Sequence, residues 1–196
     1  MSERTRIFLT GVGGQGTLTA TNLLALAVLD KGLPVTSGEI HGMAQRGGVV
    51  ESTILIGGWQ SLSMSHGEAD VLLGFEPLET LRALPYLKPG GTIVSSSEAV
   101  PPVAVSLGQA EYPPFEHIKE KAEACSGAAT FVPCRTLGLE AGALQSGNIA
   151  LLGAACSLGL VAVDVDELKA AVAKHLRPKL VDTNVRAIDI GVAALS

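Results

Sequence analysis

Short apolar runs alternate with longer helix-like segments over the first two thirds of the chain. Runs of three to eight residues rich in Val, Ile and Leu, and bounded by Gly, Pro or Ser, are typical of buried β-strands. This pattern predicts strands at residues 6–10, 33–37, 49–56, 71–74, 92–95 and 130–132. The spacing between them leaves room for connecting helices, which is the arrangement of a mainly parallel sheet.

The segments between and after these strands carry helical patterns. Residues 17–29 are apolar almost all round, so we expect this helix to be covered on both sides. The remaining predicted helices begin at Pro77 or span 116–124, 137–143, 148–158, 166–175 and 184–195. We find no internal repeat or linker. The sequence therefore predicts one α/β domain over residues 1–196, a three-layer α/β/α, Rossmann-like fold with helices on both faces of the sheet.

Composition narrows the possible functions. Of the 196 residues 47% are hydrophobic, and the formal net charge is −5, which argues against a general nucleic-acid binder.

The N-terminus lacks the apolar core of a secretory signal, and apolar stretches end before 18 residues, so we expect no membrane span. The three cysteines form no C-x-x-C pair, which argues against a disulfide framework, an iron–sulfur site or a zinc site. We expect a cytoplasmic protein with no metal site in this chain.

A glycine-rich turn follows the first predicted strand. Gly11, Gly13 and Gly16, with Gly14 and Gln15 between them, fit the G-x-G-x-x-G fingerprint of dinucleotide-binding folds. That fingerprint also needs an acidic residue about 20 positions later, and Glu39 stands only near that place. Two interpretations stay open: a nucleotide-binding loop, or glycines that let helix and strand pack closely.

A second polar cluster follows the second predicted strand. Glu39, His41, Gln45 and Arg46, the last followed by Gly47 and Gly48, lie within ten residues that we expect to form a loop. Because carboxyl-end loops share one crevice in such sheets, we expect this loop to lie beside the glycine turn. A guanidinium next to two glycines suits a carboxylate or a phosphate.

Six ordered motifs carry a family resemblance that runs from about residue 6 to 191. They are GVGGQG, GEIHGMAQRGG, ADVLLGFEPLETLR, PPVAVSLGQAEYP, GNIALLGAA and NVRAIDIG. Together they resemble the gamma-type subunits of 2-oxoacid:ferredoxin oxidoreductases, and within that group they are most similar to the small, or beta, subunits of the indolepyruvate type.

The resemblance implies a complex that oxidatively decarboxylates a 2-oxoacid to an acyl-CoA and passes electrons to ferredoxin. A large (alpha) subunit would carry thiamine diphosphate with magnesium and the iron–sulfur clusters, with coenzyme A bound on or near it. It implies no catalytic residue and no firmly bound cofactor in this chain. It further implies that the glycine turn is a packing device more than a nicotinamide site.

We expect a face made of Gly13, Gly14, Gln15, Glu39, His41, Gln45 and Arg46 to dock on the large subunit and help close its active-site or coenzyme A channel. Three alternatives stay open: a gamma subunit acting with pyruvate or 2-oxoglutarate, a self-sufficient NAD(P)- or flavin-binding protein, and a non-enzymatic nucleotide sensor or scaffold.

Other positions have structural interpretations. Asn148 is expected to be a helix N-cap. The basic residues near the C-terminus are expected at a solvated helix end, with an acidic partner or coenzyme A phosphates as the alternative; they are Lys169, Lys174, His175, Arg177 and Lys179. Trp59 and His66 are placed in an exposed loop, and residues 98–114 in an irregular, interface-forming connection.

Overall fold

The computed structural model describes residues 4–14, 16–41 and 48–195. Within them one six-stranded sheet runs in the order β2-β3-β1-β4-β5-β6. Its strands are β1 (Thr5–Val12), β2 (Val35–His41), β3 (Val49–Ile56), β4 (Ala69–Gly74), β5 (Leu87–Ser96) and β6 (Ala128–Val132). All six predicted strands are present.

The sheet is mainly parallel, as predicted. Strands β1, β4, β5 and β6 pair in parallel, whereas β3 pairs antiparallel with both β1 and β2. Because β2 and β1 are both antiparallel to β3, β2 runs in the same direction as β1. The carboxyl ends of every strand except β3 therefore lie at one edge of the sheet, where ligand crevices form in such folds.

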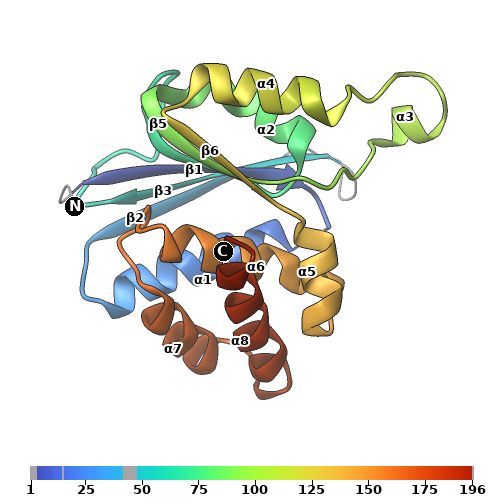
Figure 1. Cartoon of the computed structure of the whole chain (residues 1–196). Helices are drawn as coiled ribbons and strands as arrows, with labels where there is room; N and C mark the ends of the chain where they lie inside the picture. The colour runs from blue at the N-terminus through green and yellow to red at the C-terminus, as the bar shows by residue number, and fades with distance from the viewer. Residues whose placement is uncertain (1–3, 15, 42–47, 196) are drawn as a thin grey trace.

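Helices cover both faces of the sheet, which confirms the three-layer α/β/α prediction (Figure 1). On one side lie α2 (Pro77–Ala83) and α4 (Phe115–Cys125). On the other side lie α1 (Thr17–Asp30), α5 (Cys134–Ala141), α6 (Gly147–Ser157), α7 (Val165–His175) and α8 (Pro178–Ala193). Short 3-10 turns, η1 (Leu84–Tyr86) and η2 (Leu144–Ser146), and the four-residue α3 (Val103–Ser106) complete the chain.

Alternation along β1 divides the core into two layers. Ile7 and Leu9 belong to the larger cluster, on the side of α1 and α6, whereas Phe8 belongs to the smaller cluster on the opposite side. Helix α6 is buried from Gly147 to Cys156, because the sheet, α1, α5, α7 and α8 surround it. Its all-round apolar sequence is the signature of a helix without a solvent-facing side.

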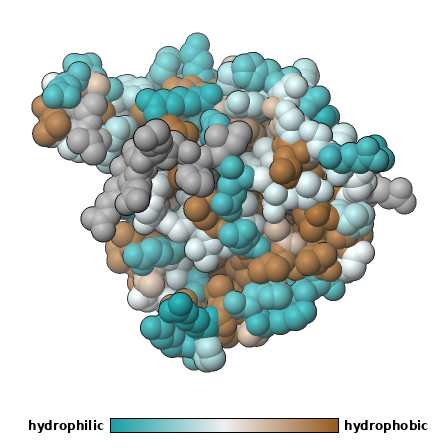
Figure 2. Space-filling model, turned by 180° about the vertical axis from the view of Figure 1, so that it is seen from behind, coloured by the Kyte–Doolittle hydropathy of each residue, from teal (hydrophilic) through white to brown (hydrophobic). Residues whose placement is uncertain are grey.

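Residues 98–114 form the irregular connection that was predicted, apart from the four-residue helix α3. The segment carrying α3 stands away from the rest of the chain in both whole-chain views (Figures 1 and 2), and Leu107 is 65% exposed. Of the helices that the structure describes, none has the length and apolar character needed to cross a bilayer.

Candidate functional site

The crevice at the carboxyl edge lies between β1 and β4. The chain leaves β1 through α1 on one face of the sheet and leaves β4 through α2 on the other. The edge therefore opens where the two connections diverge, which is the usual place for a ligand in a doubly wound sheet.

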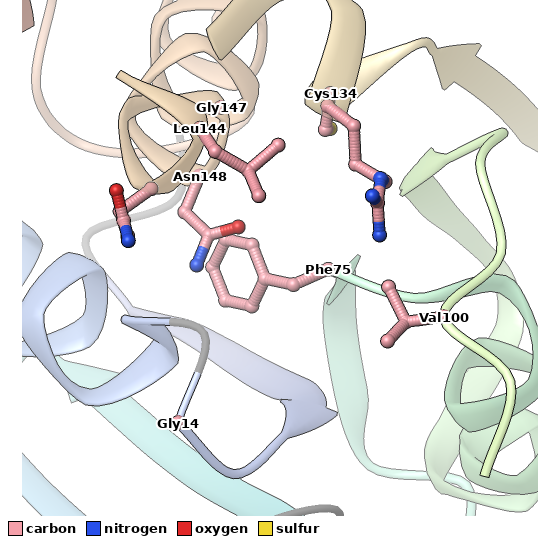
Figure 3. Close-up of a pocket in the computed structure, with 9 residues that line it drawn as sticks. Gly14, Phe75, Val100, Cys134, Leu144, Gly147 and Asn148 are labelled. Carbon is pink, nitrogen blue, oxygen red and sulfur yellow. The ribbon is translucent and has the colours of Figure 1, made fainter. Parts of the chain in front are cut away.

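A cavity of about 90 Å3 occupies this position (Figure 3). Segments that follow the four strands β1, β4, β5 and β6 line it, together with η2 and the start of α6. The lining residues are Gly14, Phe75, Val100, Cys134, Arg135, Leu144, Gln145, Gly147 and Asn148. Figure 3 shows the Asn148 amide beside the Phe75 ring, with Gly14 below them. Ligand pockets for drug-sized molecules usually hold roughly 300–1,000 Å3, so this cavity is too small to enclose a dinucleotide.

The glycines of the first motif have distinct structural roles. Gly11 lies within β1 and pairs with Val50, so the prediction that it belongs to the turn is wrong. A Cβ at Gly11 would lie 2.7 Å from Thr17 Oγ1 and 3.1 Å from Phe75 Cβ, which explains the need for glycine where strand, helix and crevice meet.

Gly14 and Gly16 form the turn itself. Their φ angles are 89° and 85°, in the left-handed region that favours glycine. The Gly13 amide donates to the Gly48 carbonyl at 2.8 Å and so ties the turn to the chain entering β3. These contacts fit the close-packing interpretation of the motif.

Partial positive charge gathers around the cavity. Helices α5 and α6 begin at two of its lining residues, Cys134 and Gly147. The start of α5 is already occupied by the Glu98 carboxylate, which accepts from the Thr136 amide and hydroxyl at 2.9 and 2.7 Å. The start of α6 and the Arg135 guanidinium favour an anionic group, and the Glu98 carboxylate opposes one.

The thiol in the cavity is chemically inert. Burial raises the pKa of Cys134 to about 12, and a hydrogen bond from Ser96 offsets only part of this shift. At neutral pH the group is therefore a thiol, which is a poor nucleophile and metal ligand. Among the described residues, no group of three or more His, Cys, Asp or Glu side chains is placed to hold a metal ion.

The described residues of the second predicted cluster divide between two places. Gly48 lies beside the glycine turn, as expected, because its carbonyl accepts from the Gly13 amide. Strand β2 continues to His41, so the prediction that Glu39 and His41 lie in a loop is wrong: both are strand residues. Glu39 pairs with Ser52, which pairs with Leu9. Glu39 is therefore two strands, or roughly 10 Å, from β1.

Glu39 lines a different cavity from Gly14. This second cavity, of about 310 Å3, is lined by Phe8, Gly38, Glu39, Glu51, Ser52, Thr53, Leu62, Ser63, Met64 and Tyr86. Of the other predicted site residues, Gln15, Gln45, Arg46 and Gly47 lie outside the described residues.

The sequence analysis missed the residues that organise the far side of the edge. Glu76 follows β4 and is 1% exposed; its Oε2 accepts a 2.9 Å hydrogen bond from the Glu79 amide and so caps α2. The sequence did contain a signal for this role. Proline is common at the first position of a helix, so Pro77 indicates that Glu76, directly before it, is the N-cap. Arg135, which lines the first cavity, has no such local signature.

One structural interpretation needs correction. Asn148 is not the N-cap of α6: the cap is Ser146, and Asn148 is a buried residue that lines the first cavity.

The solvated helix end predicted for the C-terminal basic residues is confirmed. Lys174 and His175 lie in the last turn of α7, and Lys174, Arg177 and Lys179 are exposed. Three of the five basic residues also form ion pairs: Lys174 and His175 contact Asp30 at 2.6 and 2.8 Å, and Lys169 contacts Asp189 at 2.5 Å.

Trp59 packs within its own chain. Two guanidinium groups, those of Arg4 and Arg6, lie 5.2 and 5.0 Å from its ring centre, and its indole nitrogen donates to the Ile56 carbonyl at 3.0 Å. His66 is exposed and meets the edge of the Tyr86 ring.

Comparisons with known proteins agree with this architecture. The chain is 40% identical to the indolepyruvate oxidoreductase subunit IorB of Pyrococcus horikoshii, over 96% of this chain and 94% of that protein. It is 34% identical to the IorB subunit of Methanothermobacter thermautotrophicus, over 96% of each chain.

Solved structures share the fold at lower identity. Pyruvate oxidoreductase subunit PORC of Thermotoga maritima superposes with a TM-score of 0.73 at 20% identity, covering 98% of this chain and 97% of that one. The gamma subunit of keto/oxoacid ferredoxin oxidoreductase from Geobacter sulfurreducens gives 0.69 at 23%, covering 97% of each. Residues 6–194 match the sequence pattern of one family, so this chain belongs to the pyruvate ferredoxin/flavodoxin oxidoreductase family.

Proposed function

We propose that this chain is the small subunit of an indolepyruvate:ferredoxin oxidoreductase. The observation that carries the proposal is the 40% identity to an indolepyruvate oxidoreductase subunit over nearly the full length of both chains. The complex would convert an aryl 2-oxoacid and coenzyme A into an aryl-acetyl-CoA and carbon dioxide, with two electrons passed to ferredoxin. We expect the assembly to act in the cytoplasm.

The chemistry is assigned to the large subunit. Thiamine diphosphate with magnesium and the iron–sulfur clusters would be held there, because the described residues of this chain offer no metal-binding group and the edge cavity holds only about 90 Å3. The contribution of this chain would be to position and close the site of its neighbour, for which a rigid sheet edge is suited.

The docking face proposed for that role includes Gly13, Gly14, Glu39 and His41, together with Gln15, Gln45 and Arg46 from outside the described residues. We expect Arg46→Ala to lower activity or assembly of the complex without unfolding this chain. Unchanged activity together with unchanged assembly would contradict this choice of face.

The direct test is anaerobic co-purification of the tagged chain from its own host. A brown complex with a large subunit in equal amount, which reduces a viologen dye with an aryl 2-oxoacid and coenzyme A, is the expected result. A colourless chain that elutes alone would contradict the subunit proposal. Titration of the pure chain with NAD(P)H, followed by fluorescence, would then test the nucleotide-binding alternative.

A second candidate substrate class rests on a weaker similarity. The chain is 27% identical to the pyruvate/ketoisovalerate oxidoreductases common subunit gamma of Thermococcus kodakarensis, over 91% of this chain. The purified complex should therefore be assayed with pyruvate, 2-oxoglutarate and indolepyruvate side by side. Preference for either of the first two would move the assignment within the family without changing the role of this chain.

A further inference from the structure

One face of strands β2 and β3 carries no helix. Helices α2 and α4 lie on this side of the sheet and pack on β1, β4, β5 and β6. The connection from β3 to β4 crosses β2 and β3 instead: Leu62 contacts Gly38, and the Thr53 hydroxyl donates to the Leu62 carbonyl at 3.2 Å. The cavity of about 310 Å3 lies beneath this connection.

The inner part of the cavity is apolar. Phe8 stacks on Tyr86 with ring centres 4.1 Å apart, and both rings line it together with Met64 and Leu62. Leu62 is 46% exposed although it covers the strands beneath it. Such walls suit an apolar stem or a flat side chain that enters from outside.

The end of the cavity nearest the carboxyl edge is acidic. Glu51 lines it and pairs directly with Thr10 of β1, so the two side chains point to the same face as that of Phe8. Among the described residues, no cation forms an ion pair with Glu51.

Behind the cavity wall, two buried polar atoms have no hydrogen-bond partner among the described residues. They are Thr10 Oγ1, in a residue that pairs with Glu51 and is 1% exposed, and Glu79 Oε2, in a residue 3% exposed. The other oxygen of Glu79 accepts a 2.7 Å hydrogen bond from Arg82. Burial raises the pKa of Glu79, and the nearby carboxylates of Glu76 and Glu51 add to this effect. A positive charge at Glu51 would therefore offset the repulsion between these carboxylates.

We infer that this cavity receives a lysine or arginine side chain of the large subunit. Its stem would lie along Phe8, Tyr86 and Met64, and its cationic head would meet the acidic end at Glu51. The inference rests on the proposed function, since that function supplies the partner. It selects the helix-free face of β2 and β3 as part of the interface, separate from the cavity lined by Gly14 and Arg135.

The test measures binding of this chain to the purified large subunit by isothermal titration calorimetry. Glu51→Gln keeps the size of the side chain and removes its charge, and we expect it to weaken binding about tenfold or more. The matched control is Glu116→Gln, an exposed carboxylate on α4 that removes the same charge and should leave the affinity unchanged. The affinity of the wild-type chain should also fall more steeply with salt than that of Glu51→Gln.

The outcomes separate the two proposals. Equal affinity of Glu51→Gln and wild type would overturn the inference, and so would equal weakening by the α4 control. A lower melting temperature of the isolated Glu51→Gln chain would also count against it, because Glu51 would then serve this chain's own fold. Failure of the wild-type chain to bind the large subunit at all would overturn the proposed function together with the inference.

Discussion

The Tyr112 hydroxyl donates a 2.5 Å hydrogen bond to Glu76 Oε1, which joins residues 36 positions apart in the chain. The same carboxylate oxygen accepts from the Val100 amide at 3.1 Å, and the Tyr112 oxygen accepts from the Leu78 amide at 3.1 Å. A single buried carboxylate thus holds both the start of α2 and the base of the segment that carries α3.

We predict that Tyr112→Phe lowers the free energy of unfolding by about 2 kcal/mol, because it removes a hydrogen bond to a buried charged group. Urea denaturation monitored by circular dichroism measures this change. Tyr86 is the matched control, since its ring stacks on Phe8 and we expect Tyr86→Phe to cost much less. Equal losses of unfolding free energy for both variants would show that the hydrogen bond from Tyr112 to Glu76 does not stabilise the fold as predicted.

Glu79 should make stability depend on pH. Its pKa is raised above the ordinary value of 4.5, mainly by burial, so the folded chain holds this proton more tightly than the unfolded chain. Its contribution to stability is therefore greatest below the unfolded pKa and declines as the pH rises through the folded pKa. Glu79→Gln lacks this titration, so the stability of the variant relative to wild type should improve between pH 4 and pH 7.

Urea titrations of both proteins across that range measure the difference. A difference that is constant with pH, or one that favours wild type more strongly at pH 7, would contradict the raised pKa.

The pKa shift of Asp30 has the opposite sign: hydrogen bonds from Lys174 and His175 lower its pKa. Its stabilising effect should be present above the ordinary pKa of 3.8 and lost as the pH falls through the folded pKa.

The three cysteines should react at very different rates. Cys125 is exposed, whereas Cys134 and Cys156 are buried and burial raises the pKa of each thiol to about 12. We expect a disulfide reagent at pH 8 to modify Cys125 rapidly. Cys134 and Cys156 should react at least roughly 100-fold more slowly, because a buried thiol reacts only after local opening. Mass spectrometry of the labelled peptides identifies them, and rapid labelling of Cys134 would contradict its burial.

Gly147 should tolerate no side chain. A Cβ at this position would lie 2.0 Å from the Cys134 carbonyl oxygen, so α5 and α6 would have to separate. We expect Gly147→Ala to destabilise the chain by about 3 kcal/mol or more. Ser157→Ala, at the exposed end of the same helix, is the control and should change stability by less than about 0.5 kcal/mol. Similar melting temperatures for the two variants would contradict the tight packing.

Local patterns were sufficient for most of the fold. Apolar runs identified every strand. The helix enclosed on all sides is α6, not α1 as expected, since Thr19, Asn22 and Leu29 of α1 are exposed. The limits of strands were less accessible: β1 extends through Gly11 and β2 through His41, because pairing with β3 continues past the point where the apolar pattern stops. Hydrogen-bond pairing, not hydrophobicity, sets those ends.

The candidate site, like the fold, was only partly predictable from the sequence. The sequence by itself determined the alternation of strands and helices, the glycine turn and the family motifs, since these depend on side-chain period and on residues close together in the chain. Only the tertiary structure decided that Gly14 and Glu39 line different cavities, that Glu76 meets Tyr112, and that Lys174 meets Asp30 across 144 positions. Those relationships depend on strand order and on how helices pack across the sheet, and no local pattern encodes the contacts that packing creates.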